Sequence, residues 1–272
     1  MNILITGTGH GGSWQIRASQ LGKVLDAQVV PLANDIQISR ADVVINVKHT
    51  VPNIKYAKVS VLDIIDAYPQ PTCMSWEKNA CIEWGRRYCA PYTYTIAATH
   101  KMQQDLKTDF WLRHHYRPGI IENQIKQNIK TIGYEGRSKY IGTYLPIIEQ
   151  QCKIRGWQFV VNPINVADCD VILAIRDKPW KGYATDNWKS CVKMSNAIGS
   201  LTPLIALNEQ GYQETNLPFV AIQKATELSG VFDKISDFKC RADMAMQYKN
   251  AKNYYSIETI GQEYRQWLNS KF

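Results

Sequence analysis

Short apolar runs recur through the first 119 residues, and polar or helically spaced segments separate them. Such runs, bounded by Gly, Pro or polar residues, are typical of buried β-strands. Ser13 is expected to cap the first helix, in which Trp14, Ile16 and Leu21 recur at helical spacing. The predicted strands are residues 2–6, 27–32, 42–47, 59–65, 92–97 and 109–112.

The same alternation returns after a polar, Gln- and Asn-rich stretch at 120–130. Residues 140–155 and a segment around 189–198 have helical spacing, and 256–272 include an amphipathic helix. The predicted strands of this second half are residues 130–134, 157–161, 170–175, 203–207 and 219–222.

Strands that alternate with helices indicate parallel βαβ units. The predicted fold class is therefore α/β, with two Rossmann-like domains facing each other across a cleft. We assign 1–119 to the N-terminal domain, 120–130 to a linker and 131–255 to the C-terminal domain. Ligands of open α/β sheets lie at the carboxyl ends of the strands. The candidate site-building loops therefore follow residues 6, 48, 65, 97, 112, 134, 175 and 207.

Composition narrows the class of partner. The formal net charge is +8, which favours an anionic partner such as nucleic acid, a nucleotide phosphate or an acidic membrane surface. No apolar run approaches the roughly 18 residues of a membrane span, and residues 2–6 are typical of a strand and not of a signal peptide. Seven cysteines without a C-x-x-C pair indicate free thiols in a reducing compartment. A soluble, cytoplasmic protein is expected, and its oligomeric state is left open.

Residues 7–12 read GTGHGG and match the dinucleotide fingerprint G-x-G-x-x-G between a strand and a helix. That fingerprint needs an acidic residue at the end of the second strand, and here Asp35 comes late. We therefore favour a tight turn that opens the floor of the cleft over NAD binding. Its residues are Gly9, His10, Gly11, Gly12 and Ser13.

Two basic segments of the second half are candidates for binding a diphosphate. Gly136, Arg137 and Lys139 lie between a strand and a helix, where the helix dipole and both cations act on the same negative charge. Lys189 and Lys193 are expected one helical turn apart on one face. The alternative for both segments is a solvated basic surface.

Carboxylates and histidines also follow predicted strands of the first half. Asp63 and Asp66 stand where an apolar strand runs into a Pro-rich loop, and either could accept a proton from an attacking hydroxyl. The alternative for Asp66 is a hydrogen bond to the Tyr68-Pro69 turn. His114 and His115 point opposite ways on an extended segment, so we expect at most one in the cleft. Without a third ligand at metal spacing, no metal site is expected.

Several segments together resemble glycosyltransferases of the GT-B architecture. The resemblance is carried by IGYEGRSK (132–139), DVILAIRD (170–177) and KSCVKMSNAIGSLTPLIA (189–206), and by GHGGSWQIRASQLG (9–22) in the first half. It implies an N-terminal acceptor domain, a C-terminal donor-nucleotide domain and a final helix, 256–272, that packs back on the N-terminal domain. It also implies that a set of basic and amide side chains binds the donor, namely Arg137, Lys139, Arg176, Lys189, Lys193 and Asn196.

The run VLDIIDAYPQPTCMSW (61–76) is loosely similar to the segment that carries the catalytic aspartate in phage DNA β-glucosyltransferases. Many GT-B relatives carry two glutamates eight positions apart on the nucleotide-binding helix. Trp188 and Asn196 stand at those positions here. The resemblance therefore leaves Asn196 as the substitute ligand of the ribose.

The leading hypothesis is transfer of a sugar from a nucleotide-diphosphate donor, most simply a UDP-sugar, with no tightly bound cofactor. Asp66 or Asp63 would be the base. The favoured acceptor is a hydroxymethylated pyrimidine in DNA, and a surface glycan or lipid-linked acceptor is the alternative. An NAD-dependent Rossmann enzyme and a non-catalytic binding module stay open.

Overall fold

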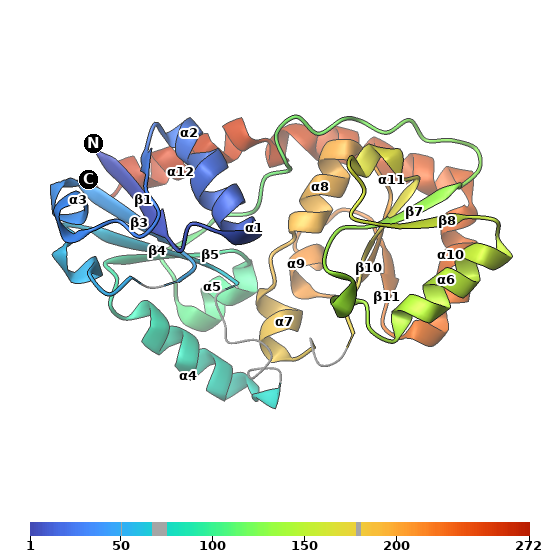
Figure 1. Ribbon diagram of the computed structural model, residues 1–272, viewed down its shortest axis with the longest axis horizontal. Helices are drawn as coiled ribbons and strands as arrows, with labels where there is room; N and C mark the ends of the chain where they lie inside the picture. Colours follow the sequence, from blue (N-terminus) through green and yellow to red (C-terminus); the bar gives the residue numbers. More distant parts are fainter. Residues whose placement is uncertain (50, 67–74, 178–180) are drawn as a thin grey trace. The chain divides into compact units, whose positions relative to one another are not determined.

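The computed structural model describes residues 1–49, 51–66, 75–177 and 181–272 (Figure 1). The chain forms two compact units. Unit 1 comprises Met1–His115, Gly182–Ser190 and Ile257–Phe272, and unit 2 comprises Tyr116–Lys181 and Cys191–Ser256. Within the described ranges, no helix combines the length and the apolar character needed to cross a membrane.

Unit 1 is built on a parallel sheet with the strand order β2-β1-β3-β4-β5-β6. The strands β1, β3 and β4 are buried along their whole length, because helices cover both faces of a parallel sheet. This burial explains their nearly continuous apolar runs. The strands are β1 (Ile3–Gly7), β2 (Gln28–Val29), β3 (Val43–Val47), β4 (Ser60–Ile65), β5 (Tyr94–Ala97) and β6 (Phe110–Trp111).

Alternate residues of these strands enter two hydrophobic clusters. Leu4 and Leu62 belong to one cluster, whereas Ile3, Ile5 and Val61 belong to the other, as the period of two along a strand requires. The helical elements of unit 1 are α1 (Gly11–Trp14), the π-helix η1 (Gln15–Gln20), α2 (Leu21–Leu25), α3 (Asp35–Arg40), η2 (Ile54–Tyr56), α4 (Lys78–Cys89), α5 (His100–Leu106), α7 (Tyr183–Trp188) and α12 (Ile257–Asn269).

The C-terminal helix α12 lies against α2 (Figure 1). Its buried residues include Ile260, Tyr264 and Leu268, which share the cluster of β1 and α2. A Cβ on Gly261 would come within 2.4 Å of Val24, so a glycine is needed for this close approach. Residues Ile257–Phe272 therefore belong to unit 1.

Unit 2 repeats the topology of unit 1 with the order β11-β10-β9-β7-β8, also parallel throughout. One hydrophobic cluster spans this unit. Its strands are β7 (Thr131–Tyr134), β8 (Gln158–Val161), β9 (Val171–Ala174), β10 (Leu204–Leu207) and β11 (Val220–Ile222).

The helical elements of unit 2 cover this sheet (Figure 1). Among them, α8 and α11 pack against each other, as do α10 and α6. They are η4 (Ser138–Tyr140), α6 (Tyr144–Ile154), η5 (Val166–Asp168), α8 (Val192–Ser200), α9 (Gln210–Gln213), η6 (Ala225–Glu227), α10 (Leu228–Ser236), α11 (Phe238–Ala251) and η7 (Lys252–Tyr255).

The predicted α/β class with two Rossmann-like sheets is confirmed, but the chain crosses between the units at a place that the pattern did not predict. Segment Gly182–Ser190, expected in the C-terminal domain, belongs to unit 1. Its Trp188 is 1% exposed, and the indole N–H donates to Asp105 at 2.9 Å. Tyr183 donates its hydroxyl to the same carboxylate at 2.7 Å. Burial of the Trp188 ring and partial burial of the Tyr183 ring, each with a satisfied polar end, therefore hold the segment in unit 1.

The expected linker 120–130 packs on unit 2. Asn123 donates its backbone N–H to the carbonyl of Ser200 at 2.7 Å and its side-chain amide to that of Cys169 at 3.1 Å. Ile129 is buried in the cluster of unit 2. This segment is therefore an ordered part of the second unit.

In each sheet the first strand along the chain lies between the second and the third strand. The first crossover connection leads from β1 to its neighbour on one side, β2, and the next one passes β1 to reach its neighbour on the other side, β3. The connections around β7 follow the same course, to β8 and then to β9. Such a switch point opens a crevice at the carboxyl ends of the strands, where α/β proteins bind ligands. The expected places are between β1 and β3 in unit 1 and between β7 and β9 in unit 2.

Candidate functional site

A cavity of about 170 Å³ lies at the switch point of unit 1. It is formed by the loop and helix that follow β1 and by the loop that follows β3. Its lining residues are Thr8, His10, Gly11, Gly12, Ser13, Trp14, Val47, Lys48 and His49. The Gly-rich turn of the sequence therefore does lie at a hollow on the carboxyl edge.

Gly9 shapes this turn without lining the cavity. Its φ is +79°, and a Cβ there would come within 2.6 Å of Pro31. Pro31 follows β2, so the position where the dinucleotide fingerprint needs a carboxylate is apolar. Asp35 begins α3 instead and accepts a hydrogen bond from Asn53 at 2.9 Å. This arrangement removes the expected ribose ligand of NAD.

Asp66 directly follows β4 and holds two ammonium groups. Lys48 Nζ lies 2.8 Å from Asp66 Oδ1, and Lys189 Nζ pairs with Asp66 Oδ2. The Ser13 hydroxyl donates to Oδ1 at 3.4 Å. Ser13 does not cap the first helix as predicted, because α1 begins earlier, at Gly11, after the N-cap His10.

Burial alone would raise the pKa of Asp66, but the charges of Lys189 and Lys48 outweigh it and lower the pKa below its ordinary value. The carboxylate is therefore ionised at neutral pH and is a weak base. Two cations against one anion leave a surplus positive charge beside the cavity. Asp66 is better suited to position the two lysines than to accept a proton.

The backbone that presents Lys48 and Asp66 is strained. Lys48 has φ +68° and Ile65 has φ +50°, in a region that residues other than glycine rarely adopt and β-branched residues such as isoleucine least of all. The β4–β5 register also shifts between Asp63 and Ile65, a type of irregularity that re-aims side chains beside active sites. Such strain persists only where the surroundings enforce it.

Two hydrogen bonds enforce it at Lys48. The Lys48 N–H donates to the carbonyl of Asp63 at 2.8 Å, and the Tyr88 hydroxyl donates to the Lys48 carbonyl at 2.7 Å. Trp84 stacks on Tyr88 with ring centroids 4.9 Å apart. The aromatic face of α4 thus fixes the loop that carries Lys48.

Asp63, the other predicted base, is instead an interior residue of β4. It is 1% exposed, and its Oδ2 lies 3.5 Å from Nε of the equally buried Arg17. Burial raises the pKa of Asp63 and outweighs the opposing charge of Arg17. It does not line the cavity, so this prediction is corrected.

His114 and His115 are each 1% exposed and lie outside the lining of the cavity. His115 Nε2 donates to the carbonyl of Ile16 at 3.2 Å. Burial, then the charges of Arg17 and His115, lowers the pKa of His114 well below its ordinary value. Both side chains are therefore part of the interior of unit 1.

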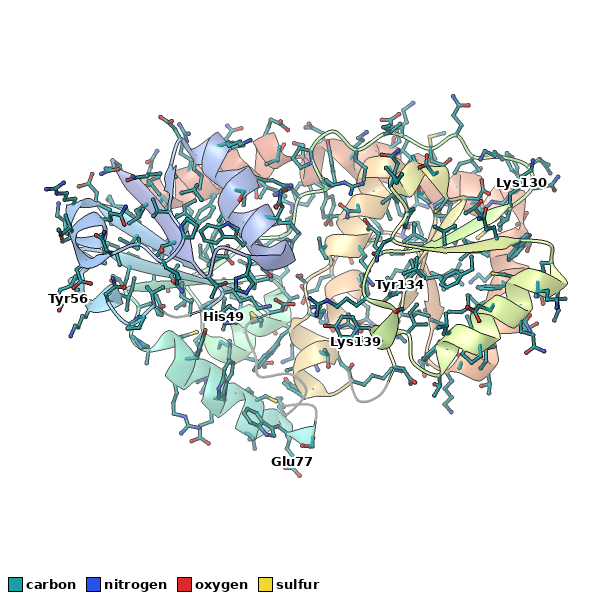
Figure 2. All side chains as sticks on the ribbon, in the orientation of Figure 1. His49, Tyr56, Glu77, Lys130, Tyr134 and Lys139 are labelled. Carbon is teal, nitrogen blue, oxygen red and sulfur yellow. The ribbon has the colours of Figure 1, made fainter. Side chains whose placement is uncertain are left out.

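His10 and His49 are the imidazoles that line the cavity. His10 Nδ1 lies 3.0 Å from the carbonyl oxygen of Thr8. A carbonyl only accepts, so Nδ1 carries the proton and Nε2 of the neutral ring is left with the lone pair. Burial and the charge of Lys48 lower the pKa of His49 (labelled in Figure 2). At neutral pH this ring is therefore uncharged.

The switch point of unit 2 gathers residues from the end of β7 and from α8. Lys193 Nζ lies 4.1 Å from the ring centroid of Tyr134, a residue that is labelled in Figure 2. The Asn196 amide donates to Glu135 Oε2 at 3.1 Å, and its Oδ1 accepts the backbone N–H of Arg117 at 3.0 Å. Asn196 therefore orients Glu135, and the predicted direct contact with a ribose would need these bonds to break.

The loop after β7 carries the predicted phosphate ligands. Gly136 has φ +144°, and its N–H donates to Asn162 at 2.8 Å. Arg137 and Lys139 are exposed in and beside the short turn η4, with Lys139 Nζ 5.5 Å from the Tyr140 ring centroid. The structure leaves both cations at the carboxyl edge of β7.

Arg176, predicted as a donor ligand, is paired with a residue that the sequence analysis missed. Its Nε lies 2.8 Å from Glu209 Oε1, and its Nη2 donates to Oε2 at 3.0 Å. The side chains are 13% and 4% exposed. The charge of Arg176 is therefore neutralised inside unit 2. Glu209 lies in the loop after residue 207, which follows a predicted strand. Its position at a strand end was the feature of the sequence that could have identified it as a site residue.

The predicted pairing of Lys189 and Lys193 on one helix is wrong. α7 ends at Trp188 and α8 begins at Val192, so the two lysines belong to different units. Trp188, placed by resemblance on the nucleotide-binding helix, is the buried anchor of α7. Lys48 and His49, which the sequence analysis did not select, follow the predicted strand 42–47. Within the described ranges, no group of three His, Cys, Asp or Glu side chains is arranged to hold a metal ion.

No family model and no curated protein matches the sequence. Among solved structures, HepE from Anabaena in complex with UDP and glucose is similar with a TM-score of 0.71 and 11% identity, covering 99% of this chain and 100% of HepE. AviGT4, a glycosyltransferase involved in avilamycin A biosynthesis, has a TM-score of 0.60 at 11% identity over 98% and 96% of the two chains.

The lipopolysaccharide outer core galactosyltransferase WaaB has a TM-score of 0.55 at 7% identity over the full length of both chains. At these identities the likeness concerns the fold. The chain has the GT-B-type fold of these glycosyltransferases, as the sequence resemblance predicted. The finer similarity to phage DNA β-glucosyltransferases stays a prediction, and residues 67–74 of its segment 61–76 lie outside the described residues.

Proposed function

We propose that the protein is a glycosyltransferase that moves a sugar from a UDP-sugar to a hydroxyl group of an acceptor. The observation that carries this proposal is a GT-B-type fold that places polar and basic groups at the switch points of both sheets. HepE, which shares this fold over its whole length, was crystallised with UDP and glucose. The donor is assigned to unit 2 and the acceptor to unit 1.

In unit 2 the donor nucleotide would bind at the carboxyl ends of β7 and β9. The Glu135 carboxylate, oriented by Asn196, is a hydrogen-bond acceptor suited to ribose hydroxyls. Lys193, with Arg137 and Lys139 on the loop, would stabilise the charge that grows on the departing diphosphate. Arg176 contributes indirectly, because Glu209 already holds its guanidinium.

In unit 1 the proposed proton acceptor is His10, in place of Asp66 and Asp63. During transfer, the bond between the anomeric carbon and the diphosphate oxygen breaks, and a bond from the acceptor oxygen to that carbon forms. The hydroxyl proton moves to His10 Nε2, and the diphosphate leaves with the bonding electron pair. Thr8 favours this role, since its carbonyl holds the proton on Nδ1.

Titration calorimetry with UDP tests the donor site. Arg137→Ala/Lys139→Ala should weaken UDP binding about tenfold or more, since hydrogen bonds to charged groups contribute about 1.5–3 kcal/mol each. Lys153→Ala, which removes an exposed lysine of α6, is the matched control and should bind UDP like the wild type. Equal affinity in all three proteins would refute the assignment of the loop.

A hydroxymethylated pyrimidine in DNA is the finer acceptor prediction from the sequence. The net charge of +8 supports it, whereas a glycan acceptor is supported by the fold shared with WaaB, described as a lipopolysaccharide galactosyltransferase. Duplex binding that falls steeply as salt rises would support the DNA acceptor. Absence of duplex binding at low salt would argue against the DNA acceptor and favour the glycan acceptor.

NAD binding is the competing interpretation of the Gly-rich turn. The apolar Pro31 beside Gly9 and the engagement of Asp35 by Asn53 speak against it. Quenching of tryptophan fluorescence by NADH but not by UDP would favour the dehydrogenase over the glycosyltransferase.

A further inference from the structure

The cavity of unit 1 has more positive charge around it than the transfer of a proton from a neutral hydroxyl requires. Lys48 lines the cavity, and Lys189 shares the carboxylate of Asp66 with it. The sum of these three charges is +1. An ammonium group has three N–H donors, and one hydrogen bond to Asp66 leaves Lys48 able to donate to a ligand as well.

The backbone is arranged to keep Lys48 at this place. A lysine with φ +68° is uncommon, and its N–H and carbonyl are both held by hydrogen bonds, to Asp63 and Tyr88. If the role of Lys48 were only to neutralise Asp66, a flexible side chain on an unstrained loop would suffice. Strain of this kind points to a position that a ligand needs.

Part of the cavity lining is backbone without side chains, at Gly11 and Gly12. A Cβ built on Gly11 or Gly12 would meet no atom within 4 Å, so a ligand can approach the main chain there. The volume of about 170 Å³ is smaller than the roughly 300–1,000 Å³ of a typical small-molecule pocket. The cavity therefore fits one substituent of an acceptor and not an entire oligosaccharide.

We propose that this cavity binds an anionic substituent of the acceptor, a phosphate or a carboxylate group, so that the acceptor is an acidic or phosphorylated sugar. The inference rests on the proposed glycosyl transfer. Lys48 would pair with the anion while Asp66 keeps its ammonium group in place. The neutral His49 beside it would donate a further hydrogen bond through its ring N–H.

Titration calorimetry with four small probes tests this assignment. Glucose 6-phosphate and glucuronate present the two anions, inorganic phosphate presents the anion alone, and glucose is the neutral control. The wild type should bind at least one acidic sugar about tenfold or more tightly than glucose. The tighter of the two acidic sugars identifies the source of the charge, and equal binding of glucose and both acids would overturn the proposal.

Lys48→Met retains the apolar stem and removes the charge. It should reduce the affinity for the acidic sugar about tenfold and leave UDP binding unchanged. Lys78→Met, an exposed position at the start of α4, is the matched control and should behave like the wild type. Unchanged binding of the acidic sugar to Lys48→Met would contradict the proposal, as would a parallel loss of UDP affinity, which would assign the cavity to the donor diphosphate.

Gly12→Val provides an independent variant, because it fills the open space beside this backbone without changing a charge. It should abolish binding of the acidic sugar, and circular dichroism should show an unchanged fold. If a folded Gly12→Val protein still binds the acidic sugar, the cavity is not the binding site of the anion. UDP binding by the wild type is measured in the same series, so failure of the donor assignment is recognised separately from failure of the anion site.

Discussion

The carboxyl edges of the two sheets share a topology and differ in their electrostatics. In unit 1 a single carboxylate, Asp66, faces Lys48 and Lys189, and the loops that present it are strained. At the carboxyl edge of unit 2, Arg176 is instead paired one to one with Glu209. Arg137 and Lys139 lie on an exposed loop of the same edge.

This difference indicates that the two units are suited to different chemistry. The strand order determines where a ligand can lie, whereas the side chains at each edge determine which chemistry is possible. Unit 1 has a preorganised positive site at Lys48 and Lys189, near the His10 ring that the Thr8 carbonyl orients. Unit 2 has a neutral buried pair, and in the proposed function the exposed Arg137 and Lys139 contact the diphosphate.

The largest expected effect concerns His10. His10→Ala should reduce turnover of a UDP-sugar about 100-fold or more, because a positioned general base contributes about 10²–10⁴ to the rate. UDP affinity, measured by calorimetry, should be unchanged, since the donor is assigned to unit 2. Wild-type turnover of His10→Ala would show that His10 is not the general base of the reaction.

Glu209→Ala tests the balanced pair of unit 2. It leaves the guanidinium of Arg176 buried without its counter-charge, and we expect the free energy of unfolding to fall by about 3 kcal/mol. Urea denaturation followed by circular dichroism measures this change. Arg176→Met/Glu209→Met, which replaces both charges by apolar groups, should recover most of the loss. If the double variant is as unstable as the single one, packing and not charge explains the effect.

Asp66→Asn tests the unbalanced cluster of unit 1. Two ammonium groups then face each other without a carboxylate, and we expect a loss of about 2 kcal/mol at pH 7, moderated because both lysines are partly solvated. Glu83→Gln, which removes an exposed partner of Arg87 on α4, is the control and should change stability far less.

The pH dependence of that loss follows from the lowered pKa of Asp66. The stabilising contribution of the carboxylate is present above its unfolded pKa of about 3.9 and is lost as the pH falls through the lower folded value. The stability difference between wild type and Asp66→Asn should therefore be constant near neutrality and shrink below about pH 4. A difference that disappears between pH 5 and 7 would contradict the assignment.

The smallest expected effect is that of Asn196→Ala. Its amide orients Glu135, so its loss should weaken UDP binding about fivefold to tenfold, as one hydrogen bond of about 1 kcal/mol predicts. Glu135→Gln should weaken UDP binding at least as much, because Asn196 acts through it. If Asn196→Ala is more harmful than Glu135→Gln, then Asn196 contacts the nucleotide directly, as the sequence resemblance implied.

Much of the architecture was accessible from the sequence because it depends on local patterns. Apolar runs predicted the central strands, Gly-rich turns predicted the loop after β1, and strand ends predicted where site residues would lie. Choosing between Asp63 and Asp66 was not possible in this way. Both follow apolar neighbours, and a strand covered on both faces buries Asp63 whichever way it points.

What tertiary structure alone decided was the identity of each charged partner. Lys189 pairs with Asp66 across 123 positions of the chain, because burial of the neighbouring Trp188 holds this segment in unit 1. Glu209 meets Arg176 because β9 and β10 are neighbours in the sheet. The amino-acid pattern is local and therefore specifies the strands and the edge at which ligands bind. Charge pairing depends on contacts between distant segments, so only the folded chain determines which cations are neutralised and which can bind a ligand.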